Sequence, residues 1–346
     1  MRILSQTIPS GANVHKNFLP VFRTLLGLVA MVYIIRSIYL LQISDPGIWK
    51  NTLQLTPLSA VLFLFVLLLM SLNWGVEVLK WKILSSKLEQ LSIVKLIKSV
   101  LFGISLGMIT PKRTGECAGR IMLLSPGYRF KGLLLSTAGS MSQLFVTLLM
   151  GTTGLLIMMK SFPEGTFLYN SGLKLNSDVI LTISIFWTIG LPAILYFITH
   201  TGFRFNKNSK TASRINNLFD TFSYLSVTDI FVLISLSLFR YFIFASQFWI
   251  LMIIAGLYIP IIDFFALISV IYLLMALIPL SAIWELGIRG SVALFVFGIY
   301  FSEGIAFQPA VIAASTGLWF INLAMPALAG GIIAISSDFR NQFQDA

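Results

Sequence analysis

Charged side chains at regular spacing interrupt two apolar stretches of this chain. The first stretch contains Arg113, Glu116 and Arg120 within "ITPKRTGECAGR", and the second contains Glu285 and Arg289 within "IPLSAIWELGIRG". Residues four apart lie on one helix face, so Glu116 can pair with Arg120, and Glu285 with Arg289. A guanidinium in apolar surroundings either pairs with a carboxylate or binds an anion. These residue types therefore favour the binding of a negatively charged ligand.

One further cation lies deep in an apolar run. Arg240 is near the middle of "SLSLFRYFIFASQFW", where a charge costs roughly 3 kcal/mol on membrane-insertion scales. It needs a partner such as Glu285 or an anionic ligand. Arg36 lies close to the end of its run, from which its side chain can reach the membrane surface. Glu77, which is flanked by tryptophan and lysine, is expected to be an interfacial anchor.

The composition identifies the environment in which these charges must work. Of the 346 residues, 57% are hydrophobic and 11% are charged, and the mean hydropathy is +0.90. A soluble protein has about 25% charged residues, and the apolar runs do not alternate in polarity like barrel strands. We therefore expect an all-α, polytopic integral membrane protein. The net charge of +11 reports membrane topology and attraction to anionic lipids, and a nucleic-acid partner is not expected.

Six apolar runs are long enough to cross about 30 Å of hydrocarbon. They are residues 24–41, 58–76, 132–159, 179–199, 230–257 and 305–335. Two more runs, 93–124 and 259–300, are interrupted by proline, glycine and charge. The expected domains are a segment 1–23, a membrane domain 24–336 and a tail 337–346.

The distribution of lysine and arginine predicts the threading of the chain. Residues 80–98 and 111–131 each contain five cations, so both belong on the cytoplasmic side. The run between them must then enter the membrane and return, as a re-entrant hairpin surrounded by protein. Residues 259–300 form a second hairpin that enters from the outside. Both termini are expected in the cytoplasm, and the protein in the inner (plasma) membrane.

The two hairpins resemble each other. In each, a proline (Pro111 or Pro279) precedes the pair of charges, and Glu116 and Glu285 are 169 residues apart. Three predicted spans lie between them, an odd number, so the two hairpins face opposite sides of the bilayer. This pattern predicts an inverted-topology repeat, in which broken helices from both halves meet near the midplane around a substrate.

The break in the first hairpin suggests an anion site. Pro111 ends the incoming helix, and Thr114 and Gly115 can begin the next one, with Thr114 as its expected cap; Pro111 and Gly115 are thus the expected residues of the break. Free N–H groups at that helix start would attract an anion, with Lys112 and Arg113 beside them.

Simpler roles are open for the same residues. Lys112 and Arg113 could hold the hairpin mouth in the cytoplasm, and each Glu–Arg pair could be a structural ion pair. In the second hairpin, Gly287 is the corresponding hairpin glycine.

Enzyme chemistry has little support in the sequence. There is no His-Glu-x-x-His motif and no aspartate cluster that could hold magnesium. The single cysteine and the two distant histidines provide no metal site. We therefore expect neither a catalytic residue nor a bound metal or cofactor.

The first hairpin motif resembles a known family. Pro111, Arg113, Gly115, Glu116 and Arg120 match the proline-x-arginine-x-glycine-glutamate pattern of the flippase-like family named for the membrane region of lysylphosphatidylglycerol synthase. The resemblance extends from about the first span to the last. It implies a transporter similar to those that move aminoacylated phospholipids or polyprenyl-linked sugars between leaflets.

The second motif departs from the family pattern. Ile283 and Trp284 replace a glycine pair, Gly290 follows the arginine, and the acid lies earlier, at Glu285. These departures bear on the identity of the lipid, because the second hairpin would line part of the site. The soluble domain of the synthase has no counterpart here, so the resemblance implies no synthase activity.

Three functions are consistent with these features. The first is a lipid transporter, or flippase, that moves an anionic or phosphate-bearing lipid between leaflets. In it, Lys112, Arg113, Arg120, Arg240 and Arg289 bind the head group, and Glu116 and Glu285 orient them. The second is a scaffold subunit of an envelope-biogenesis complex, and the third is a membrane-embedded lipid-modifying enzyme. The oligomeric state is open.

Overall fold

The computed structural model describes residues 28–43, 45–47, 52, 56–110, 113–161, 177–187, 220–278, 282–301 and 305–335. Of these residues 87% are helical and none is in a strand, so the all-α class is confirmed for this part of the chain. Several predictions lie outside the described residues: the segment 1–23, the tail 337–346, Pro111, Lys112 and Pro279.

Four helices are long and apolar enough to cross a membrane. They are α3 (Pro57–Ser85), α6 (Arg129–Ser161, preceded by the short helix η1, Pro126–Tyr128), α11 (Val227–Ile254) and the continuous run of α14 (Gln308–Trp319), a π-helix (Phe320–Ala324) and α15 (Met325–Ile335). These helices correspond to four of the six predicted spans. The helix Leu28–Ile43 and α8 (Ser177–Ile185) fall within or overlap the other two, and the exact number of spans stays a prediction.

Local capping determines where two of these helices begin. The Thr56 hydroxyl accepts a hydrogen bond from the N–H of Ser59, whose own hydroxyl accepts one from the N–H of Thr56, and Pro57 follows the cap. Ser226 and Asp229 form the same reciprocal arrangement before α11. Such a capping box satisfies N–H groups that a helix end leaves free. The capping residues are polar and therefore lie outside the apolar runs. For this reason α3 and α11 begin before the apolar runs from which they were predicted.

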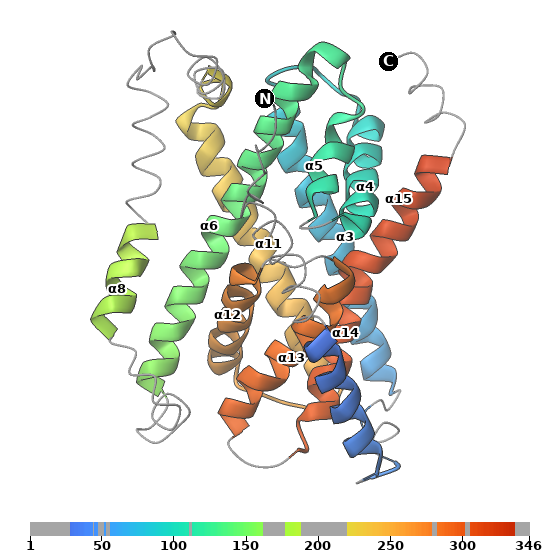
Figure 1. Ribbon diagram of the computed structural model, residues 1–346, viewed down its shortest axis with the longest axis vertical. Helices are drawn as coiled ribbons and strands as arrows, with labels where there is room; N and C mark the ends of the chain where they lie inside the picture. Colours follow the sequence, from blue (N-terminus) through green and yellow to red (C-terminus); the bar gives the residue numbers. More distant parts are fainter. Residues whose placement is uncertain are drawn as a thin grey trace, which may run out of the picture.

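The two interrupted runs fold as helical hairpins. The first consists of α4 (Ile93–Ile109) and α5 (Thr114–Ile121), and the second of α12 (Ile261–Leu277) and α13 (Ala282–Phe301). In Figure 1, α4 and α5 occupy the upper half of the molecule, and α12 and α13 the lower half.

Each hairpin is closed at its base by a carboxylate. Glu89 accepts hydrogen bonds from the backbone N–H of Ser125 at 2.9 Å and from its hydroxyl at 3.1 Å. In the second hairpin, the Tyr300 hydroxyl donates to Asp263 at 3.0 Å. Each hairpin therefore leaves and returns at one end of the bundle. The tips meet, because a guanidinium nitrogen of Arg113 lies 4.0 Å from a carboxylate oxygen of Glu285.

Glycine allows the helices of the first hairpin to touch. A Cβ atom on Gly119 would lie 2.5 Å from the Cα of Gly103, and one on Gly115 would lie 2.5 Å from the carbonyl oxygen of Leu106. Gly330 of α15 approaches α4 similarly, since its Cβ would lie 2.0 Å from the carbonyl oxygen of Leu101. Small residues permit such backbone contact between membrane helices. Gly115 therefore lies within α5 and mediates packing.

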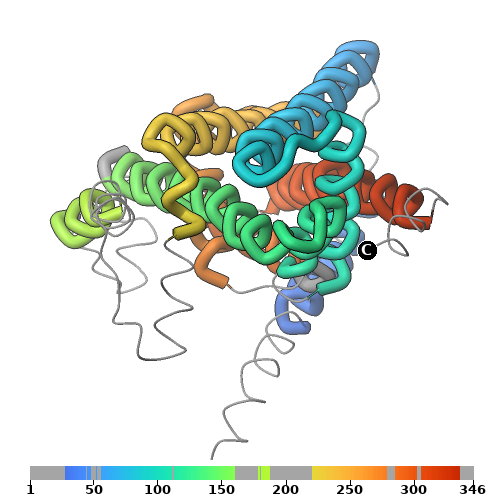
Figure 2. The backbone as a smooth tube through the Cα atoms, turned by 90° about the horizontal axis from the view of Figure 1, so that it is seen from above, coloured from blue at the N-terminus to red at the C-terminus, as the bar shows by residue number. Residues whose placement is uncertain are grey.

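The apolar core has two main clusters. One is built largely on α11, α12, α13 and α14, and the other on α3, α4, α6 and α15. Seen from above, α6 lies beside α11, and α8 lies at the periphery against α6 (Figure 2). The second hairpin is thus embedded in the first cluster and the first hairpin in the second.

Gly119→Ala should destabilise the protein, because the added methyl group meets backbone that cannot move aside. Overpacking of this kind costs about 1–3 kcal/mol, which a lower melting temperature of the detergent-solubilised protein would register. Gly75→Ala in α3 is the matched control. No atom lies within 4 Å of its added Cβ, so this change should be neutral or stabilising. Equal melting temperatures for the two variants would contradict the close contact of α4 with α5.

Candidate functional site

A buried carboxylate joins three helices. Glu77 of α3 is 2% exposed. Its Oε1 lies 2.7 Å from Nη2 of Arg120 in α5, and its Oε2 accepts a hydrogen bond from Nη1 of Arg240 in α11. Nζ of Lys80, one turn further along α3, lies 3.8 Å from the same carboxylate and donates to the carbonyl of Gly139 in α6 at 2.9 Å. Glu77 thus holds cations from two other helices.

The ion pairs continue to the hairpin tips. Arg120 also lies 2.5 Å from Glu116, and Glu116 lies 3.4 Å from Arg113. Arg113 reaches Glu285 across the tips, and Glu285 lies 2.5 Å from Arg289 in α13. Both predicted pairs at four-residue spacing are therefore formed, and they belong to one connected network. Arg120 is shared between two carboxylates, so its role is not confined to its own hairpin.

The network is rich in positive charge. Among the described residues it joins five cations to three carboxylates, which leaves two positive charges uncompensated. The cations are Lys80, Arg113, Arg120, Arg240 and Arg289, and the carboxylates are Glu77, Glu116 and Glu285. Buried charge persists where it is paired or binds something charged. The excess is therefore a feature that a ligand could compensate.

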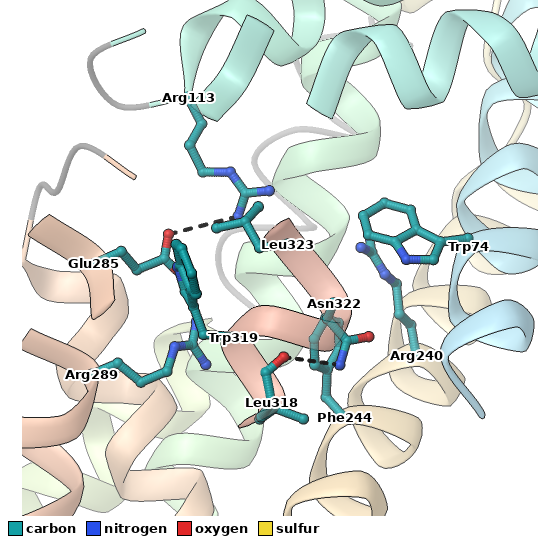
Figure 3. Close-up of a pocket in the computed structure, with 10 residues that line it drawn as sticks. All are labelled: Trp74, Arg113, Arg240, Phe244, Glu285, Arg289, Leu318, Trp319, Asn322 and Leu323. Atoms are coloured by element: carbon teal, nitrogen blue, oxygen red, sulfur yellow. Dashed lines mark hydrogen bonds and ion pairs between the residues drawn. The ribbon is translucent and has the colours of Figure 1, made fainter. Parts of the chain in front are cut away.

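A cavity of about 50 Å³ lies between the hairpin tips. Its lining residues are Trp74, Arg113, Arg240, Phe244, Glu285, Arg289, Leu318, Trp319, Asn322 and Leu323. Figure 3 shows these side chains arranged around a common space, with three guanidinium groups arriving from α11, α13 and the start of α5. One water needs roughly 10–15 Å³ of such space, so the cavity has room for a few waters or a small polar group.

The backbone of Arg113 is unusual. Its φ angle of 56° lies in the left-handed region. Among the described residues, only Gly256 also has a positive φ. Residues with side chains occupy this region at a cost and only where their surroundings hold them there. Contacts with Glu116 and Glu285 hold the side chain of Arg113. The turn thereby directs a cation across the gap between the two hairpins.

A chain of buried amides leads away from the cavity. Nε of Arg240 donates to Asn73 at 2.7 Å, Asn73 donates to Asn322 at 3.1 Å, and Asn322 donates to Gln247 at 3.0 Å. Gln247 completes the chain by donating to the backbone carbonyl of Val66 at 3.0 Å. Asn322 lies in the π-helix, just before Pro326, which has no N–H to donate to the preceding turn. Single π-turns of this kind occur frequently at functional sites.

The structure brings most of the predicted site residues together. Arg113, Arg240, Glu285 and Arg289 line the cavity. Glu116 and Arg120 lie behind it and connect it to Glu77. Lys112 lies outside the described residues.

One sequence-based interpretation of this region is wrong. Glu77 is not an interfacial anchor, because it is buried and holds Arg120 and Arg240. Arg240 pairs with Glu77 rather than with Glu285, and it also lines the cavity between the hairpin tips, so an anionic ligand stays a prediction as its further partner. The only signal for the role of Glu77 in the sequence is the four-residue spacing of Asn73 and Glu77, which places both on one face of α3.

The expected cap of α5 is also wrong. Thr114 is the first helical residue, and the cap position belongs to Arg113, without a side-chain hydrogen bond. The N–H of Gly115 donates to the Thr110 hydroxyl at 2.8 Å, and that of Glu116 to the carbonyl of Arg113 at 3.0 Å. These N–H groups are already satisfied, so positive charge at the site comes from guanidinium groups. Gly287 lies within α13, past the hairpin turn.

The chain matches no protein-family model and no curated protein sequence. The resemblance of its first hairpin motif to the flippase-like family therefore stays a prediction.

Glu77→Gln should strongly destabilise the protein, because it leaves Arg120 and Arg240 buried with less compensation. Breaking a buried ion pair in this way costs about 3–5 kcal/mol. Glu89→Gln, the same change at the hairpin base, should cost less than about 1 kcal/mol. Thermal unfolding of both variants in detergent measures the difference. If the two variants melt together, Glu77 does not hold the site.

Proposed function

We propose that this protein is an integral membrane lipid transporter that binds an anionic or phosphate-bearing head group between its two hairpins and moves it between leaflets. The observation that carries the proposal is the convergence of Arg113, Arg240 and Arg289 on one cavity. Three guanidinium groups facing a shared space suit a phosphate, because guanidinium groups bind phosphate oxygens through strong, charge-assisted hydrogen bonds.

The depth of the site supports this function. Arg240 is midway along the 28-residue α11, so in a helix that crosses the bilayer its guanidinium lies near the midplane. Lipid transport requires a polar group to cross that region, where an unpaired charge is costly. The head group would occupy the cavity while the acyl chains stay in the bilayer.

Movement between leaflets requires the tips to separate. The cavity of about 50 Å³ is smaller than a lipid head group, so in the proposed cycle it corresponds to a closed state of the site. The contact of Arg113 with Glu285, at 4.0 Å, joins the two tips and is the longest ion pair in the network. Opening on either side of this contact would expose the cavity to one leaflet at a time.

An inverted-topology repeat would give the two openings equivalent roles. Matching features support it: each hairpin has a carboxylate at its base and a Glu–Arg pair four residues apart. The topology proposed with it has six spans, two re-entrant hairpins and both termini in the cytoplasm. The flippase-like family resemblance agrees with this arrangement.

The close packing of the hairpins favours a second candidate. Gly103 and Gly119 bring α4 and α5 into backbone contact, and the cavity is small, as in a structural interface. A scaffold subunit of an envelope-biogenesis complex would need such rigidity and no transport. The transport assay below separates the two functions.

In liposomes, the purified protein should accelerate the exchange of a fluorescent phospholipid between leaflets. Chemical quenching of the fluorophores in the outer leaflet measures this exchange. Arg240→Gln and Arg289→Gln should each slow this exchange at least tenfold, since each removes a charge-assisted hydrogen bond to the phosphate. Arg36→Gln, which changes an exposed arginine of another helix, should not slow it. A wild-type rate equal to that of protein-free liposomes, for phospholipids of every charge class, would favour the scaffold.

Labelling of introduced cysteines tests the topology. In a Cys117→Ser background, Gln90→Cys and Gly127→Cys flank the first hairpin, and Tyr258→Cys precedes the second; all three positions are exposed. A membrane-impermeant maleimide should label the first two from the cytoplasmic side only and the third from the outside only. Labelling of positions 90 and 127 from opposite sides would refute the re-entrant hairpin.

A further inference from the structure

The cavity is lined by hydrogen-bond donors that have no acceptor. Among the described residues, the buried N–H groups without a partner include the indole Nε1 of Trp74 and Trp319 and the Nε of Arg113 and Arg289. All four residues line the cavity. Buried polar groups are nearly always hydrogen-bonded, and an exception calls for an explanation such as a missing ligand.

The acceptors of the same lining are occupied. The carboxylate of Glu285 lies against Arg289 and Arg113, and the side-chain oxygen of Asn322 accepts a hydrogen bond from Asn73. A ligand that satisfies the cavity must therefore offer acceptors and need not donate. An oxyanion has this property, whereas an ammonium group would meet three arginines and a single carboxylate, Glu285, that is already paired.

The charge of the network indicates how much negative charge the ligand has. The five cations and three carboxylates leave an excess of two. The cavity lining alone gives the same result, with three arginines and one glutamate. A zwitterionic head group would leave both charges uncompensated, and a phosphodiester with one charge would leave one. A group with two negative charges balances the site.

We infer that the cavity takes a doubly charged phosphate group, either a phosphate monoester or a diphosphate esterified at both ends, and this inference rests on the proposed role of the cavity as a head-group site. Its oxygens accept from the two indoles and from the Nε groups of Arg113 and Arg289. Arg240, which lies 5.5 Å from the Trp74 ring and 5.6 Å from the Phe244 ring, contributes the third guanidinium. The site thereby distinguishes a phosphate monoester from the phosphodiesters that form most of the bilayer.

Binding to the full chain in detergent at pH 8.5 tests the inference. A phosphate monoester has lost its second proton at this pH, so dioctanoyl phosphatidic acid has two charges. Dioctanoyl phosphatidylglycerol has one, and dioctanoyl phosphatidylethanolamine has no net charge. We expect calorimetry to give at least tenfold tighter binding of the first. Equal affinity for phosphatidic acid and phosphatidylglycerol, or no binding of either, would overturn the inference.

Inorganic phosphate distinguishes a lipid from a soluble source of the same group. If phosphate binds as tightly as dioctanoyl phosphatidic acid and competes with it, the doubly charged group alone is recognised, and a soluble phosphate compound is the ligand. If phosphatidic acid binds at least tenfold more tightly than phosphate, a lipid is the ligand. Both outcomes support a doubly charged phosphate site.

Tryptophan-to-phenylalanine variants isolate the donors. Trp319→Phe and Trp74→Phe remove one N–H each and keep an aromatic ring, so each should weaken binding of phosphatidic acid roughly five- to tenfold. Their melting temperatures without ligand should fall no further than that of the Trp81→Phe control, because the lost N–H has no partner and only the smaller ring affects packing. Trp81→Phe is the matched control: its N–H is also buried without a partner, but Trp81 is not among the cavity lining. Unchanged binding in the first two variants, or an equal loss in the control, would contradict the assignment.

Arg289→Gln tests the charge count. It leaves one uncompensated charge, so the preference for phosphatidic acid over phosphatidylglycerol should fall from at least tenfold toward equality, and an unchanged ratio would contradict the count. These binding results are independent of transport. Selective binding without lipid exchange would support the doubly charged phosphate site and refute the transporter. Lipid exchange without charge selectivity would support the transporter and refute the doubly charged phosphate site.

Discussion

The contact of Glu77 with Arg120 and Arg240 is the interaction on which the site depends. It joins α3, α5 and α11, and through Arg120 it determines where the first hairpin lies. The hairpin in turn directs Arg113 to Glu285 in the second hairpin. Because membrane helices gain little from apolar contact with one another in lipid, a polar contact of this kind can determine their relative positions. These ion pairs hold Arg113 and Arg240 in place, and the cavity is the space that remains between them.

The proposed re-entrant hairpins require protein to cover their broken backbone, because lipid cannot satisfy it. Here α4 and α5 lie against each other through glycine, and α15 covers α4 at Gly330. Hydrogen bonds at the two bases keep each hairpin folded back on itself. The rigid surroundings hold Arg113 in its left-handed conformation, so a costly local geometry persists at the position where it directs a charge.

The sequence predicts those features that depend on neighbouring residues. Apolar length predicts α3, α6 and α11, and the four-residue spacing predicts the pairs of Glu116 with Arg120 and of Glu285 with Arg289. It misses Glu77, because its partner Arg240 is 163 residues away and the flanking tryptophans equally suit an interface. It also misplaces the cap of α5, since the hydrogen bond of Gly115 to Thr110 depends on how the turn closes.

The amide chain from Asn73 through Asn322 to Gln247 has a mechanical consequence. Each amide is the donor or acceptor of the next, and the last one is bonded to the backbone of α3. A small rotation of the π-helix would break several of these bonds together, and leaving buried amides such as Asn73 and Gln247 without partners is costly. A larger rotation that brings each amide to a new partner, by contrast, could form a complete set of hydrogen bonds again. Rotation about this helix axis is therefore restricted to discrete positions, and intermediate angles are energetically excluded.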